Sequence, residues 1–248
     1  MAEPVFEPVE NVEATDRAKA AGALAQFKQL SFYLDGSTVE TRIDEELLPA
    51  LGRAAQRRGI PPALAVRMGP WLLATSLAIP ACELARKEAG EPVLAALVAR
   101  KAEQTGKRLV GLETIEEQFN AAASLPEQFH LAALEETLQL GARTDDVMAT
   151  IKNLYANGDL AMITPLMRHV SRQVGAADNA IDFRQRLVHD RNAVMAERAR
   201  DYLADGAVFM AVGALHLPGE EGLVALLRER GFTVEPVEIR PQANGKLN

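Results

Sequence analysis

Residues 207–218 read Ala-Val-Phe-Met-Ala-Val-Gly-Ala-Leu-His-Leu-Pro, and this stretch indicates the fold most strongly. The apolar run 207–212 is typical of a buried β-strand, and Gly213 ends it. His216 follows, just before a helix predicted to begin at Pro218. Ligands of parallel α/β sheets bind at the carboxyl ends of the strands, so its position makes His216 a candidate site residue. A histidine that only caps or packs this turn is the alternative interpretation.

A second strand is predicted at 107–112, and Glu113 follows its carboxyl end. Thr114 and Glu117 have the spacing of a capping box, which predicts that a helix begins there. If both strands belong to one sheet, Glu113 and His216 share an edge, with carboxylate and imidazole within about 10 Å. Such a pair can bind a metal or orient a base. The alternative is a carboxylate that interacts only with the helix dipole.

Long helical stretches between the predicted strands favour parallel pairing. We therefore predict an α/β fold, with a small mainly parallel sheet and a large helical insertion lobe. The predicted strands lie near 30–34, 107–112, 207–212 and 232–237, with 4–9 as a candidate addition. The lobe comprises about 44–105 and 125–204 within a single domain of residues 1–240, and the polar residues 241–248 are predicted to form a disordered tail.

An arginine stripe runs along the helix predicted over 180–203. Arg184, Arg191 and Arg198 recur every seven residues beside an apolar stripe of the same period. Arg191 is expected to lie near the packed face, where its charge needs a carboxylate or an anionic ligand. We predict that Arg191 is substantially buried and pairs with Glu113, whereas Arg184 and Arg198 are more exposed.

Composition excludes some classes of function. A net charge of -7 argues against nucleic acid as the main partner, because phosphate binding needs a concentrated basic surface. The most apolar stretch, 71–82, is shorter than the about 20 residues that cross a bilayer, and it contains Pro80. We therefore expect a buried or interface helix there, with Trp71 in the core, and a soluble chain without a transmembrane segment. The single cysteine, Cys82, is predicted to be a small buried residue rather than a nucleophile.

Four stretches in a fixed order carry a family resemblance. They are 209–223, the Gly-Leu-Glu-Thr-Ile-Glu-Glu-Gln run at 111–118, Arg-Asn and Met-Ala at 191–196, and Pro-Trp at 70–71. Together they resemble the TraB/PrgY/GumN family of the Tiki-like superfamily, over about residues 30–238.

The resemblance implies a metal-dependent hydrolase of the peptidase type with a divalent zinc, manganese or cobalt ion. It implies that His216 and Glu113 act as metal ligands or bases, and that Arg191 orients a carboxylate or stabilises developing negative charge. Gly213 and Asn192 are then candidate binding residues in a cleft lined by Glu113, Arg191 and His216. The substrate would be a peptide or a small molecule, and the location periplasmic or cell-envelope. The competing hypothesis is a non-catalytic binding or regulatory protein that holds a peptide or small molecule in the same cleft.

The sequence departs from the family at its beginning. Members have two G-x-x-H motifs, and only the second is found here, ending at His216. The opening residues 3–7 resemble the stretch after the first motif, which makes Glu7 a candidate binding residue. We therefore expect a chain shortened at its amino terminus, with impaired metal binding and hydrolysis. Loss of a strand would also leave an unpaired sheet edge, which favours formation of a homo-oligomer.

Overall fold

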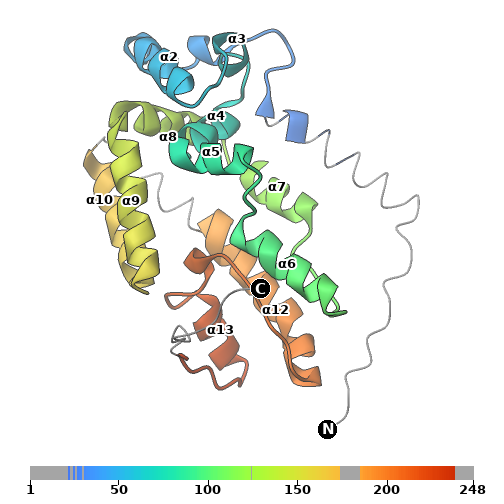
Figure 1. Ribbon diagram of the computed structural model, residues 1–248. Helices are drawn as coiled ribbons and strands as arrows, with labels where there is room; N and C mark the ends of the chain where they lie inside the picture. Colours follow the sequence, from blue (N-terminus) through green and yellow to red (C-terminus); the bar gives the residue numbers. More distant parts are fainter. Residues whose placement is uncertain are drawn as a thin grey trace.

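The computed structural model describes residues 22, 25, 27–29, 31–123, 125–173 and 185–237. Within these ranges the chain consists of helices joined by turns and coil (Figure 1). The α-helices are α2 (Leu48–Arg57), α3 (Pro62–Ala65), α4 (Pro70–Ala78), α5 (Ala81–Glu88), α6 (Leu94–Gln104), α7 (Ile115–Ala123), α8 (Glu127–Leu140), α9 (Arg143–Ala156), α10 (Ile163–Gln173), α12 (Asp190–Asp205) and α13 (Leu223–Glu229). Short helical turns are η1 (Val39–Thr41), η2 (Glu45–Leu47), η3 (Leu160–Met162), η4 (Gln185–His189) and η5 (Ala214–His216).

The predicted α/β fold is wrong. No β-strand occurs in the described ranges, where the only pairing of this kind is an isolated antiparallel bridge between Phe32 and Met68. Residues 107–112, 207–212 and 232–237 are coil, and 4–9 lie outside the described residues.

The physical reason is that the predicted strands have no ladder partners. The backbone of 207–212 makes no hydrogen bond with any described residue. The carbonyl oxygen of Leu112 accepts a hydrogen bond from Arg198 Nη1 at 2.9 Å, so a side chain takes the place of a neighbouring strand. An apolar run therefore indicates side chains that can be buried. A strand also requires neighbouring strands whose backbone groups hydrogen-bond its own N–H and carbonyl groups.

Residues 31–78 and α8 form what we call the amino-terminal lobe. In this lobe α4 packs along α8, with α2 and α3 beside them (Figure 1). Leu73 of α4 and Leu134 of α8 are fully buried at the centre of one apolar cluster. Pro70 occupies the first turn of α4, where a missing N–H costs nothing, and Pro80 follows its end. The helix predicted within 71–82 is therefore two helices, α4 and α5, and Cys82 on α5 is exposed rather than buried.

Residues 107–123 and 185–237 form what we call the carboxyl-terminal module. Here α12 packs on α13, around a smaller cluster of Met195, Ala196 and Leu223. The module contains η4, α7 and η5 in addition, so the candidate site residues lie within it.

The helix predicted to begin at Pro218 begins only at Leu223. Gly222 lies so close to the preceding turn that a Cβ there would be 2.4 Å from the carbonyl oxygen of Leu217. The chain therefore makes a tight turn through Gly219 and Gly222 before α13 can start.

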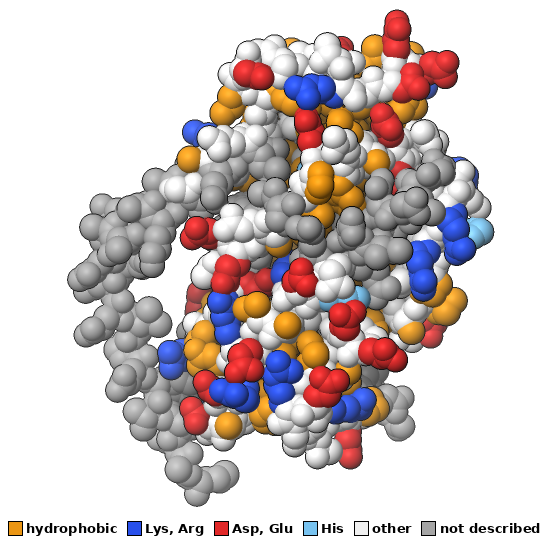
Figure 2. Space-filling view, turned by 180° about the vertical axis from the view of Figure 1, so that it is seen from behind, with side chains coloured by type: hydrophobic (Ala, Val, Ile, Leu, Met, Phe, Trp, Pro, Cys, Tyr) orange, Lys and Arg blue, Asp and Glu red, His pale blue; other side chains and the backbone are white. Residues whose placement is uncertain are grey.

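The surface carries charges of both signs. Figure 2 shows Lys and Arg interspersed with Asp and Glu over the lower half of one face, with apolar side chains between them. Across the part of the chain that the structure describes, no helix is both long and apolar enough to cross a membrane.

Candidate functional site

A bidentate ion pair joins Glu113 to Arg191. Arg191 Nε donates to Glu113 Oε1 and Nη2 donates to Oε2, both at 2.7 Å. The Glu113 side chain is 6% exposed and that of Arg191 is 24% exposed. The predicted pairing is thus confirmed, and Arg191 is only partly buried. Planar matching of guanidinium and carboxylate makes this one of the stronger contacts a protein can form.

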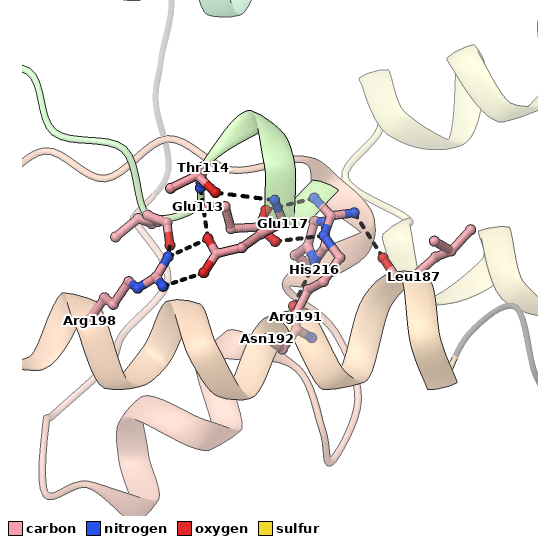
Figure 3. A network of polar contacts seen from close by, with 9 residues as sticks. Glu113, Thr114, Glu117, Leu187, Arg191, Asn192, Arg198 and His216 are labelled. Carbon is pink, nitrogen blue, oxygen red and sulfur yellow. Dashed lines mark hydrogen bonds and ion pairs between the residues drawn. The ribbon is translucent and has the colours of Figure 1, made fainter. Parts of the chain in front are cut away.

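Asn192 fixes the orientation of His216. The Asn192 side chain is fully buried, and its Nδ2 donates to the carbonyl oxygen of Glu221 at 2.7 Å. Its Oδ1 therefore faces His216 Nδ1, at 2.6 Å. An amide oxygen only accepts hydrogen bonds, so Nδ1 carries the proton. The other ring nitrogen, Nε2, then has its lone pair available (Figure 3).

The surroundings of His216 favour its neutral form. Burial lowers the pKa of the His216 imidazole below its ordinary value, and the positive charge of Arg191 lowers it further. The Glu113 carboxylate opposes this and raises the pKa of His216. The net direction is downward, so His216 is a neutral base at pH 7.

The two glycines of the predicted motifs differ in their steric surroundings. A Cβ at Gly111 would lie 2.9 Å from the carbonyl oxygen of Glu113, so the turn into Glu113 requires glycine. A Cβ at Gly213 would lie 3.4 Å from Cδ2 of His216. That separation is an ordinary van der Waals contact, so the imidazole does not require glycine at position 213.

The predicted capping box is confirmed, and it positions Glu113. Thr114 Oγ1 accepts from the Glu117 backbone N–H at 3.1 Å, and the Glu117 carboxylate accepts from the Thr114 N–H at 2.8 Å. Arg198 binds the same carboxylate at 2.5 and 2.7 Å (Figure 3). The hydrogen bond from Arg198, together with that from the Thr114 N–H, lowers the pKa of Glu117 to about 2.

Two arginines, seven residues apart on α12, thus hold both ends of the segment 113–117. The sequence spacing placed Arg191 and Arg198 on one face, and Arg198 is the more exposed, as predicted. Its ion pair with Glu117 was missed, because the capping box already accounted for Glu117. Arg184 lies outside the described residues.

A π-helical turn, η4, precedes α12 and contributes backbone to the site. The carbonyl oxygen of Leu187 in this turn accepts from Arg191 Nη1 at 2.9 Å. His189 at the end of the turn pairs with the Glu221 carboxylate. Sequence reasoning missed Leu187 and Glu221, since carbonyl oxygens and turn geometry leave no residue-type signal. Interruptions of this kind in α-helices are frequent at functional sites.

The donor set for a metal is incomplete. Both oxygens of Glu113 are occupied by Arg191, so His216 Nε2 is the free ligand atom of the pair. No group of three or more His, Cys, Asp or Glu residues suited to a metal ion occurs within the described ranges. A catalytic zinc usually takes three protein ligands. These residues therefore do not fit a metal by themselves, and Glu7 lies outside the described part of the chain.

A cavity of about 300 Å³ lies elsewhere, in the amino-terminal lobe. Its lining includes Tyr33, Trp71, Glu127 and His130, and none of Glu113, Arg191 or His216. Trp71, predicted to be core, is half-buried and lines this cavity. Desolvation, followed by the nearby Glu127 carboxylate, raises the pKa of Tyr33 to about 12, so the phenol stays protonated.

The sequence model of the TraB/PrgY/gumN family matches residues 9–236. The chain therefore belongs to this family of proteins. No solved structure matches the chain.

Similar proteins include the Metalloprotease TIKI1 of Xenopus tropicalis, 31% identical over 60% of this chain and 34% of that protein. The Metalloprotease TIKI1 of Homo sapiens is 30% identical over 64% of this chain and 36% of its own length. The Uncharacterized protein YbaP of Escherichia coli is 29% identical over 77% and 68%. The chain thus spans about a third of the length of the Tiki relatives it matches.

Proposed function

We propose that the protein is a hydrolase of the peptidase type in which His216 is the base. The observation that carries the proposal is the chain of contacts from Glu221 through Asn192 to His216, which leaves Nε2 of a neutral imidazole free. A neutral imidazole with a fixed tautomer can take a proton from water or from another nucleophile. The similarity to proteins named metalloproteases supports the same reaction class.

In this proposal Arg191 supplies the hydrogen-bond donors that stabilise developing negative charge. Its guanidinium uses three of its five N–H groups, two on Glu113 and one on the Leu187 carbonyl oxygen. The two remaining donors can stabilise negative charge that develops on a substrate oxygen. Glu113 then acts as a positioning residue, because its bidentate contact sets the plane of the guanidinium.

Metal dependence enters the proposal because the Tiki relatives are named metalloproteases. The described residues offer His216 Nε2 alone, so we assign no step to a metal. We accordingly propose that metal-dependent turnover by this chain is weak.

The test is hydrolysis of a quenched fluorescent peptide mixture, with and without Zn²⁺, Mn²⁺ or Co²⁺. We expect turnover that is lost in His216→Gln and kept in His169→Gln, a matched control whose exposed ring on α10 hydrogen-bonds Gln173. In Asn192→Leu the imidazole loses its partner, and we expect a lower kcat together with a shifted pH profile. Equal rates in the wild type and His216→Gln would contradict the proposal.

A second candidate is a binding protein without turnover. The observation that favours it is the complete occupation of the Glu113 carboxylate by Arg191, which leaves no second carboxylate ligand or base in the network. Calorimetric titration with the peptides of the hydrolysis assay, beside the assay itself, separates the two. Peptide binding without hydrolysis would favour the binding protein.

A further inference from the structure

We infer that residues 207–212 form a docking strand to which an extended, apolar polypeptide segment adds by backbone pairing. The inference rests on the proposed function, because it describes how a peptide would reach His216. The segment leads directly into Gly213 and η5, so a chain laid along it is delivered to the imidazole.

The first observation is the unsatisfied backbone. No N–H or carbonyl group of 207–212 hydrogen-bonds a residue within the described ranges, and the same holds for 108–111. In Figure 1 the trace after α12 turns back and runs beside that helix without entering an element. Unpaired backbone of this kind is a template for a further strand.

The second observation is the alternation of exposed and half-buried side chains over 209–212, which follows two exposed residues, Ala207 and Val208. Phe209 is 80% exposed and Ala211 is exposed, whereas Met210 and Val212 are half-buried. Val212 packs on the cluster of Met195, Ala196 and Leu223. A period of two is that of a strand with one covered face. Residues 209–212 therefore already present their side chains as a strand does.

The third observation concerns the chemistry of the occupant. No charged residue occurs from Gly206 to Leu215, and Val208 is about half exposed in addition to Phe209. Large apolar side chains left on a surface indicate an interaction site when they gather. The matching occupant is an extended segment with apolar side chains at alternate positions.

The test uses a soluble fluorescein-labelled octapeptide of alternating Thr and Val, with blocked ends, and the full chain of 248 residues. Binding is followed by fluorescence anisotropy. Two further peptides carry N-methyl groups, one at every odd and one at every even position. A strand pairs through one edge, so we expect one isomer to lose about tenfold or more in affinity while the other binds normally. Equal binding by both isomers, or no binding by the unmethylated peptide, would overturn the inference.

A pair of protein variants locates the site. Phe209→Asp should weaken peptide binding about tenfold, while Leu64→Asp should leave it unchanged. Leu64 is the matched control because it is 45% exposed on α3, in the other part of the molecule. Both side chains are exposed, so circular dichroism should show the wild-type helix content in each variant.

Two outcomes separate this inference from its alternatives. Binding is measured without turnover, so a chain that binds one isomer and hydrolyses nothing contradicts only the proposed function. The second outcome is self-association of the chain that Phe209→Asp abolishes and that the peptide does not disrupt. This result would identify a second copy as the occupant and overturn the inference.

Discussion

The amino-terminal lobe and the carboxyl-terminal module are held together by different forces. Within the described residues, twelve buried residues form the apolar cluster of the lobe, and three form that of the module. The module instead has bidentate ion pairs from α12 to Glu113 and Glu117 and a buried amide at Asn192. Apolar packing is non-directional, whereas these polar contacts fix side chains in one geometry. The comparison indicates that the lobe provides stability and the module provides orientation.

The largest expected effect tests the packing side of this comparison. Leu73→Ala should lower the free energy of unfolding by about 3–5 kcal/mol, because a fully buried side chain leaves a cavity among well-packed neighbours. Leu223→Ala should cost about 2–3 kcal/mol, since its cluster is small and its partly buried neighbours can close the space. Urea unfolding followed by circular dichroism measures both. A larger loss for Leu223→Ala would show that the module depends on its core as much as the lobe does.

The next effect tests the polar side. Arg191→Met should lower the free energy of unfolding by about 3 kcal/mol, because it leaves the buried Glu113 carboxylate without its partner. This is the lower end of the range for a broken buried pair, since about a quarter of the Arg191 side chain is exposed to solvent. Arg198→Met is the matched control on the same helix face. Its pair with Glu117 is exposed on both sides and screened by solvent, so the loss should be much smaller.

A double variant tests whether the Arg191–Glu113 pair orients the site or only stabilises the fold. If the Arg191–Glu113 pair orients the site, the double variant Arg191→Met, Glu113→Leu should recover most of the lost stability and none of the activity. An equal loss of stability in Arg191→Met and Arg198→Met would contradict the distinction between an orienting pair and a surface pair.

The sequence predicted local features of the module better than its architecture. The capping box follows from local spacing, the seven-residue spacing of the arginines places Arg191 near the packed face, and the structure contains both the box and the pairing of Arg191 with Glu113. The sheet does not follow, because Phe209 and Val208 have β-propensity but the strand also needs partner backbone from distant segments. Asn192 was found only through the family resemblance. Its link to His216 depends on the Glu221 carbonyl oxygen, which no residue pattern encodes.

The smallest expected effect concerns one proton at His216. Because its pKa is lowered in the folded protein, the unfolded chain takes up a proton first as the pH falls below the ordinary histidine value. His216 therefore contributes nothing to the pH dependence of stability at high pH. As the pH falls from the pKa of the unfolded chain toward the lower pKa of the folded protein, His216 destabilises the fold. His130 acts in the same direction, since burial lowers its pKa as well. The lowered carboxyl pKa values, such as that of Glu117, act only at more acid pH.

The measurement is the free energy of unfolding between pH 7.5 and 5 in the presence of EDTA. His216→Asn removes the titrating ring and keeps a donor for Asn192, so we expect a shallower pH dependence than in the wild type. His130→Asn reports the corresponding effect in the lobe. In Arg191→Met the pKa of His216 should rise, because the repelling cation is gone while the attracting Glu113 carboxylate remains. A His216 imidazole that titrates at its ordinary value in an NMR experiment would show that the network does not control its charge, and the module would then lose its role as the orienting half of the molecule.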